Sequence, residues 1–428
     1  MPSWRGVSNT FRKAPWRLPF ATLMLASVFF ADTPQTHLAA VVVAAVSLLA
    51  LGGLWLRSPA FDKNALTAGI ALWLAAIALS FPVAMYFGTT AFDWALRGAA
   101  PLSFVAAFFF IRVATPDDVT YVIRVMLACA ALWLVLVACD LAAVYPLLSI
   151  HRWTAHSGQL LLPWNIVGIA ILIFPGRPLR DAIAFPLLLL LLLVTIGAGY
   201  RSQFIIAGCL LLCGVAVALL RRDLRRSIAI IAAALLAVAA FAAISRMPAD
   251  PKAAVPEAQA CSVMGDRAMR RGPYNATVEA RKGDTGRALE VKFALQRFLE
   301  SPVLGKGLAY AVPSSLIFFG QEDYLQCLER LHGKKYPHVY YLHNFAAHVA
   351  MTMGSLGLVA LALIGAGALS SLFSRRIASR DQRLAAIAAL ASLSAFSLIG
   401  ASYNLPQFSL LLASLAAILA ATKGGEIA

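Results

Sequence analysis

Histidines are concentrated in one stretch of the sequence, HGKKYPHVYYLHNFAAHVAMTMGSLG, which leads from a polar segment into an apolar run. It contains His332, His338, His343 and His348, four of the seven histidines in the chain. Histidine titrates near neutral pH, so it can accept a proton from an alcohol as a general base. His343, which is followed by Asn344, is expected at the start of the apolar run, at the membrane surface. His348 lies one turn deeper and is more typical of a packed helix residue.

These histidines do not form a metal-binding pattern. Their separations of six, five and five residues put no two of them on one helical face, and HExxH is absent. A DxD pair is also absent, and Glu322-Asp323 is the nearest adjacent acidic pair. The sequence contains no P-loop, no GxSxG and no Rossmann fingerprint. We therefore predict neither a metal nor a cofactor.

A second candidate for chemistry is Arg201, which lies between the apolar runs FPLLLLLLLVTIGAGY and RSQFIIAG. The chain must turn at the membrane surface there, so the guanidinium is held at the end of a helix. A guanidinium can bind a phosphate group through two parallel N–H···O bonds. The alternative is that Arg201 only extends from a helix end toward water.

The elements that position these residues are predicted to be membrane helices. The chain is 61% hydrophobic and 13% charged, with a mean hydropathy of +0.77. Lipid offers no partners to backbone N–H and C=O groups, so long apolar runs must be helical. We predict an all-α polytopic membrane protein with about twelve transmembrane helices, near residues 18–32, 36–56, 66–88, 95–114, 122–145, 159–175, 181–200, 202–220, 227–246, 343–373, 383–403 and 407–422.

The distribution of basic residues predicts the orientation of these helices. Lys and Arg cluster in alternate connections, as in RRDLRR at 221–226, whereas the opposite short loops hold only Arg97, Arg152 and Arg201. Both termini are therefore expected in the cytoplasm. Residues 1–246 form nine helices, 247–342 form a periplasmic loop domain, and 343–428 form three more helices. This asymmetry accounts for the net charge of +16, so we expect membrane lipids rather than nucleic acid as partners. The first run resembles a signal peptide, but we predict that it is a helix of the protein.

The loop domain is predicted to contain one amphipathic helix, RALEVKFALQRFLE from Arg287 to Glu300, which SPVLGKG then ends. Cys261 and Cys327 are the only cysteines in this loop. Because the periplasm is oxidising, we predict that they form a disulfide; the alternative is two free thiols.

His343-Asn344, nine intervening residues and then Gly354-Ser-Leu-Gly357 resembles the H[NSQ]-x9-GxxG signature of bacterial O-antigen ligases. Two further features agree with this resemblance. Arg201 looks like the arginine of the SR turn in the wider ligase and polymerase superfamily. Arg287, with the amphipathic helix and SPVLGKG after it, is similar to a loop segment of that superfamily.

The resemblance implies a membrane glycosyltransferase at the periplasmic face of the bacterial inner membrane. It would move a polysaccharide from undecaprenyl diphosphate to lipid A–core, without a metal, and invert the anomeric centre. His343 would act as the general base, with Asn344 and His338 in support. Arg201 and Arg287 would stabilise the diphosphate leaving group.

Several alternatives stay open. One is an O-antigen polymerase, whose acceptor is another lipid-linked chain, and another is an oligosaccharyltransferase that acts on proteins. The excess of basic residues in the loop favours the ligase, because lipid A–core is densely phosphorylated. A transporter is a different class, but its charges would line a midplane pathway. Within the site, His343 would merely cap its helix if His338 were the base.

Overall fold

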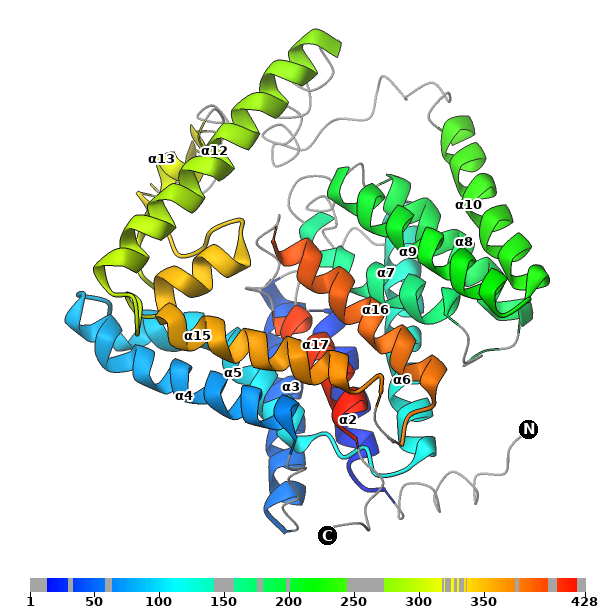
Figure 1. Ribbon diagram of the computed structural model, residues 1–428, viewed down its shortest axis with the longest axis horizontal. Coiled ribbons are helices and arrows are strands. Elements are labelled where there is room, and N and C mark those ends of the chain that lie inside the picture. Colours follow the sequence, from blue (N-terminus) through cyan, green and yellow to red (C-terminus); the bar gives the residue numbers. More distant parts are fainter. Residues whose placement is uncertain are drawn as a thin grey trace.

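The structure is a computed structural model, and it describes residues 14–29, 34–57, 64–141, 158–174, 179, 181–197, 201–244, 273–317, 319, 325–326, 329–330, 335, 337–373, 377–398 and 406–421. This part of the chain is mostly helical (Figure 1). The apolar helices are α2 (Arg17–Val28), α3 (Pro34–Arg57), α4 (Ala65–Tyr86), α5 (Ala91–Phe110), α6 (Pro116–Leu141), α7 (Gly158–Ile173), α8 (Asp181–Gly197), α9 (Arg201–Leu220), α10 (Leu224–Ile244), α15 (Phe345–Ser370), α16 (Arg380–Ser397) and α17 (Pro406–Ala420).

Each apolar run predicted from the sequence corresponds to one of these helices. Four stretches of the described chain are long and apolar enough to cross a membrane, namely Leu38–Arg57, Ala65–Tyr86, Pro116–Val135 and Phe345–Ser370. That all twelve helices cross it, in the orientation indicated by the charges, stays a prediction. Helix α5 begins earlier than expected because the Thr90 side chain accepts a hydrogen bond from the Asp93 N–H and caps the helix.

The first helix, α2, is part of the packed core. Phe20, Leu23 and Met24 are almost completely buried, and α2 packs against α3, α6 and α17. At its start, the Arg17 guanidinium pairs with the buried carboxylate of Asp118 at 2.7 Å. That this run is a permanent helix of the protein and not a signal peptide stays a prediction.

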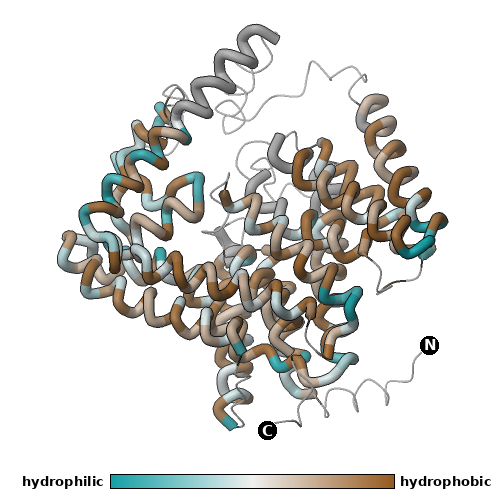
Figure 2. Tube along the Cα trace, viewed as in Figure 1, coloured by the Kyte–Doolittle hydropathy of each residue, from teal (hydrophilic) through white to brown (hydrophobic). Residues whose placement is uncertain are grey.

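Long helices from distant parts of the sequence lie side by side. Helix α15 packs along α4, α17 along α5, and α10 along α8 and α9 (Figure 1). Hydrophobic residues cover most of these helices, whereas hydrophilic residues concentrate on α12 and at helix ends (Figure 2). Large apolar side chains are exposed along α3 and α10, which suits helices that face lipid.

Within residues 247–342, the predicted loop domain, the longest described element is α12 (Pro273–Glu300). This helix is longer than predicted, since it begins at Pro273 and not at Arg287; proline is well suited to the first position of a helix. It ends at Glu300, as SPVLGKG predicts. After it come the short strand β1 (Val312–Pro313), α13 (Ser314–Ile317) and β2 (His338–Val339), which pairs antiparallel with β1. Cys261 and Cys327 lie outside the described residues, so their disulfide stays a prediction.

Helix α15 is interrupted at Gly354, whose φ of 64° and ψ of −156° are not helical. A side chain would be strained at this φ, and a Cβ there would overlap the backbone of Val303. Because the chain breaks here, the backbone groups on either side lose their helical partners and need others.

The loop that follows α12 supplies these partners. The N–H groups of the loop bond to carbonyls of the first half of α15, and loop carbonyls accept from N–H groups of the second half. The four bonds are Lys306 N to Met351 O (2.7 Å), Gly307 N to Thr352 O (2.9 Å), Ser355 N to Pro302 O (2.8 Å) and Leu356 N to Val303 O (3.2 Å). The SPVLGKG segment and the GSLG segment are therefore one structural unit.

Lys306 anchors this inserted loop. Its side chain is only 7% exposed, and its Nζ lies 2.7 Å from Glu300 Oε2 and 4.1 Å from the centre of the Phe87 ring. The hydrogen bond from Lys306 is the main cause that lowers the pKa of the Glu300 carboxyl. The loop is thus tied both to the end of α12 and to the end of α4.

Candidate active site

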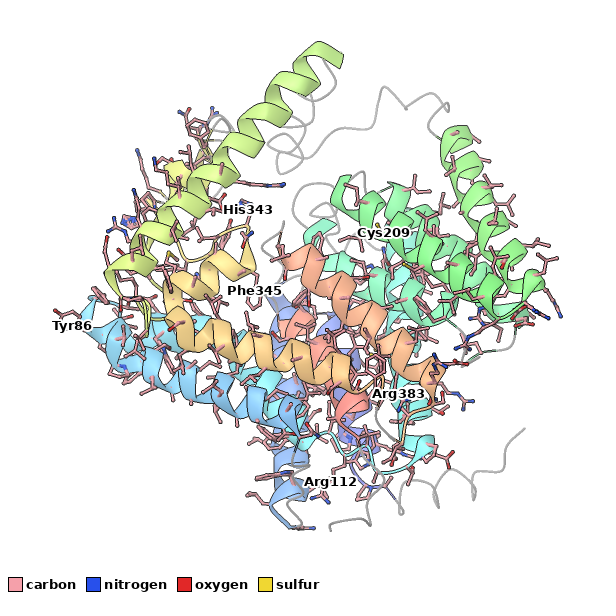
Figure 3. The ribbon with its side chains drawn as sticks, in the orientation of Figure 1. Tyr86, Arg112, Cys209, His343, Phe345 and Arg383 are labelled. Carbon is pink, nitrogen blue, oxygen red and sulfur yellow. The ribbon has the colours of Figure 1, made fainter. Side chains whose placement is uncertain are left out.

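A buried carboxylate holds a histidine at the start of α15. Glu290 lies on α12, and its side chain is only 2% exposed. Its Oε2 accepts the backbone N–H of His343 at 2.7 Å, and its Oε1 lies 2.8 Å from His343 Nδ1. Figure 3 shows His343 between α12 and the beginning of α15, with Arg112 toward the opposite end of the bundle. A single carboxylate therefore fixes both the backbone and the ring of His343.

The face of α12 that carries Glu290 is lined with small residues. Gly286, Glu290 and Ala294 follow one another at intervals of one helical turn, and all three are buried. Ala294 joins Val312, Leu342 and others in a small core that also includes the first half of α15. Small residues allow α12 to approach α15 closely, which brings the carboxylate to His343.

Asn344 is the residue that caps α15. Its side-chain oxygen accepts the N–H of Ala347 at 2.9 Å, and its carbonyl accepts the N–H of His348 at 2.9 Å. His343 therefore does not serve as the cap, and its ring is available to Glu290. In these contacts Asn344 positions the beginning of the helix.

The contact with Glu290 determines which ring nitrogen of His343 can act as a base. An ionised carboxylate can only accept hydrogen bonds, so Nδ1 carries the hydrogen in the neutral ring and Nε2 keeps its lone pair. The imidazole is 23% exposed, so it is open to solvent on one side. When Nε2 takes a proton, the ring becomes cationic beside the negative charge of Glu290. The pair is thus arranged as a general base with a fixed tautomer.

Tyr341 packs beside this pair. Its ring meets that of His343 edge-on, with centroids 6.0 Å apart and an interplanar angle of 87°. Burial raises the pKa of Tyr341, and the negative charge of Glu290 raises it further, against the opposing effect of Arg97. Tyr341 therefore stays a neutral phenol at physiological pH and shields one side of the imidazole.

None of the other predicted site residues is seen in contact with His343 in the described part of the structure. Arg287 is exposed on α12, three residues before Glu290, so the two lie on neighbouring positions of the same helix surface. His338 is exposed on β2, where it is paired in register with Pro313 rather than in contact with His343. Arg201 is the first residue of α9, but its side chain lies outside the described part of the structure.

No group of three or more His, Cys, Asp or Glu residues lies close enough to hold a metal ion, as far as the described residues extend. His332 and the acidic pair Glu322-Asp323 are outside these residues. The described site therefore consists of the His343 imidazole and the Glu290 carboxylate, with the Tyr341 ring beside them.

Residues 186–362 match a family model described as O-antigen ligase. Over this segment the chain is similar to the O-antigen ligase superfamily, and the match supports that superfamily. The matched segment begins within α8 and ends shortly after the break of α15. It therefore includes Arg201, Arg287, Glu290 and His343, together with the inserted loop. No curated protein is similar enough to the chain to count as a match.

Glu290, the carboxylate that contacts His343, was not predicted from the sequence. It lies 53 positions before His343 and belongs to a helix that was expected only to be amphipathic. A weak signal was present, because a carboxylate falls between Gly286 and Ala294 on one helix face. A charged residue between two small residues is a sign of close packing around a buried charge.

Proposed function

We propose that the protein is an O-antigen ligase that transfers a polysaccharide from undecaprenyl diphosphate to lipid A–core at the periplasmic face of the inner membrane. The match of residues 186–362 to the O-antigen ligase family model supports glycosyl transfer in general. The observation that carries the proposal is the His343–Glu290 pair, a general base on the side of the bundle that the charge distribution predicts to face the periplasm.

The reaction in this proposal is a single displacement. A hydroxyl of the acceptor sugar attacks the anomeric carbon of the donor, and its proton moves to Nε2 of His343. A new glycosidic C–O bond forms while the bond between the anomeric carbon and the diphosphate oxygen breaks. Undecaprenyl diphosphate leaves with the electron pair. Attack opposite the leaving group inverts the anomeric centre.

Each charged group has one task in this mechanism. A sugar hydroxyl is a poor nucleophile, so it needs a base in the transition state. Glu290 stabilises the imidazolium that forms, in the manner of a carboxylate behind a catalytic histidine. The leaving diphosphate gains negative charge, which Arg201 and Arg287 neutralise with paired N–H donors.

The acceptor distinguishes a ligase from a polymerase. The loop domain has more basic than acidic residues, which favours an acceptor with many phosphates such as lipid A–core. A polymerase would instead extend one lipid-linked chain with another. We prefer the ligase on this charge argument.

The proposal is tested by incubating the purified protein with undecaprenyl diphosphate-linked glycan and lipid A–core, with and without EDTA. A conjugate of glycan and lipid A–core is expected in both conditions, and none with His343→Ala. Longer lipid-linked chains formed from donor alone would identify a polymerase instead. Absence of any glycan transfer by the folded wild-type protein would refute the proposal.

A further inference from the structure

Arg97 lies on α5, two turns into the helix from its start at Ala91, and its side chain is exposed. Its guanidinium carbon is 4.8 Å from the centre of the Tyr340 ring, which is a cation–π contact. Tyr340 comes three residues before His343 and directly before Tyr341. Arg97 is therefore attached, through Tyr340, to the segment that carries the proposed base.

The direction of this side chain is unexpected for its helix. Asp93 is one turn earlier on α5, at the spacing at which an ion pair with Arg97 would be the ordinary arrangement. Instead, Asp93 Oδ2 accepts the Thr90 hydroxyl at 2.6 Å. None of the ion pairs between described residues includes Arg97. The guanidinium thus turns toward Tyr340, and its N–H donors can bind a ligand.

The surroundings of Arg97 favour an anion. The nearby carboxylate of Glu290 is buried and occupied by two donors from His343, so it is not a partner for Arg97. Arg97 contacts Tyr340, and the next residue, Tyr341, meets the His343 ring with centroids 6.0 Å apart, so the guanidinium lies against the segment that carries the pair. A guanidinium presents its N–H donors in one plane, and this geometry suits two oxygens of a phosphate group.

We propose that Arg97, held on the face of Tyr340, binds the diphosphate of the lipid-linked donor together with Arg287, from the α5 side of the site. This proposal rests on the proposed function, because it names a further residue of the same donor site. Arg97 acts as a binding residue, and its charge offsets the negative charge that develops on the leaving group.

The first measurement is the binding of undecaprenyl diphosphate, without glycan, to the purified full-length protein. Arg97→Gln should weaken this binding about tenfold or more, because a charge-assisted hydrogen bond is lost. Arg225→Gln is the matched control: it removes the same charge from an exposed arginine of α10 and should leave binding unchanged. Tyr340→Leu keeps the guanidinium but removes its platform, so it should weaken binding less than Arg97→Gln.

The second measurement is glycan transfer at varied donor concentration. Arg97→Gln should raise KM for the donor more than it lowers kcat, and Arg97→Lys should recover part of the loss. The thermal unfolding midpoint checks that each variant is folded; if Arg97→Gln is not, Arg97→Lys and Tyr340→Leu carry the test. Binding and KM equal to those of the wild type in these variants would overturn the proposal.

Failure of the proposed function looks different. If the wild type transfers no glycan but its binding of undecaprenyl diphosphate depends on Arg97, the function is wrong and the anion site stands. If the wild type transfers glycan and Arg97→Gln does so with unchanged KM, the function stands and the role of Arg97 is wrong.

Discussion

Two buried carboxylates, Asp118 and Glu290, are used in different ways by this molecule. Asp118 is surrounded by donors: its Oδ1 accepts Nε and Nη2 of Arg17, and its Oδ2 accepts the N–H groups of Ala114 and Thr115 and the hydroxyl of Thr115. These donors come from a permanent cation, a helix start and a hydroxyl. They join α2 to α6 and leave the carboxylate with no other task.

Among the described residues, Glu290 accepts from His343 alone, through the backbone N–H and Nδ1. Its partner is ionisable, and the second nitrogen of the ring is not used by the carboxylate. Both carboxylates are desolvated to a similar degree, so burial alone does not distinguish structure from function. The identity of the partner does: a fixed cation stabilises the fold, whereas an imidazole can gain and lose a proton.

Replacement of His343 tests this difference with the largest expected effect. A positioned general base typically contributes about 10²–10⁴-fold to a rate, so His343→Ala should nearly abolish glycan transfer. The protein should remain folded, because Asn344 caps α15. Transfer is measured in membranes with equal expression, and donor binding is measured separately.

His338→Ala is the matched control for this variant. His338 is exposed and its strand pairing uses only backbone groups, so its loss should change transfer little. If His338→Ala is inactive while His343→Ala ligates normally, the base has been assigned to the wrong histidine.

Glu290→Gln should have the next largest effect. The amide has one oxygen, yet it faces two N–H donors of His343; its NH₂ group therefore turns toward Nδ1 and moves the proton of the neutral ring to Nε2. That tautomer cannot accept the proton of the acceptor. Replacing the carboxylate behind a catalytic histidine by its amide can lower kcat by up to about 10⁴-fold, so kcat should fall steeply, but no further than in His343→Ala, with KM for the donor nearly unchanged. Glu290→Asp keeps the charge and should recover part of kcat; equal kcat in the Gln variant and the wild type would contradict the role.

The helices of this chain could be predicted from the sequence because lipid leaves apolar runs no alternative to a helix. The position of His343 at the start of α15 followed from the same boundary between polar and apolar residues. Glu290 could not be predicted, since its contact with His343 joins two elements distant in sequence. The break at Gly354 was also missed: the motif spacing marked the glycine, but the loop that fills the break lies some 50 residues earlier in the chain.

Arg287→Lys should lower the rate of transfer less than Glu290→Gln does. The same result is expected for Arg201→Lys. Lysine keeps the positive charge but lacks the planar pair of donors that matches a diphosphate. Loss of one charge-assisted hydrogen bond lowers kcat/KM about tenfold. Arg287 is exposed, so its replacement should leave the unfolding temperature unchanged. If the folded variants transfer glycan as fast as the wild type, a point charge is sufficient at these positions.

Asp118→Asn should have the smallest effect on transfer and a clear effect on stability. The asparagine keeps one acceptor for the start of α6, but it turns an NH₂ group or a neutral oxygen toward the Arg17 guanidinium, which then lacks its anion. Both side chains are largely buried, at 11% and 5% exposed, so little solvent screens the loss. We expect the free energy of unfolding to fall by about 1–3 kcal/mol, measured as a lower unfolding temperature in detergent.

Asp181→Asn is the control for this variant. The Asp181–Arg225 pair is exposed and its charged atoms are 3.8 Å apart, so its loss should hardly change the unfolding temperature. In the folded fraction of Asp118→Asn, kcat and KM should match those of the wild type. A lower kcat would mean that Asp118 and Glu290 are coupled. The division between a structural and a catalytic carboxylate would then not hold.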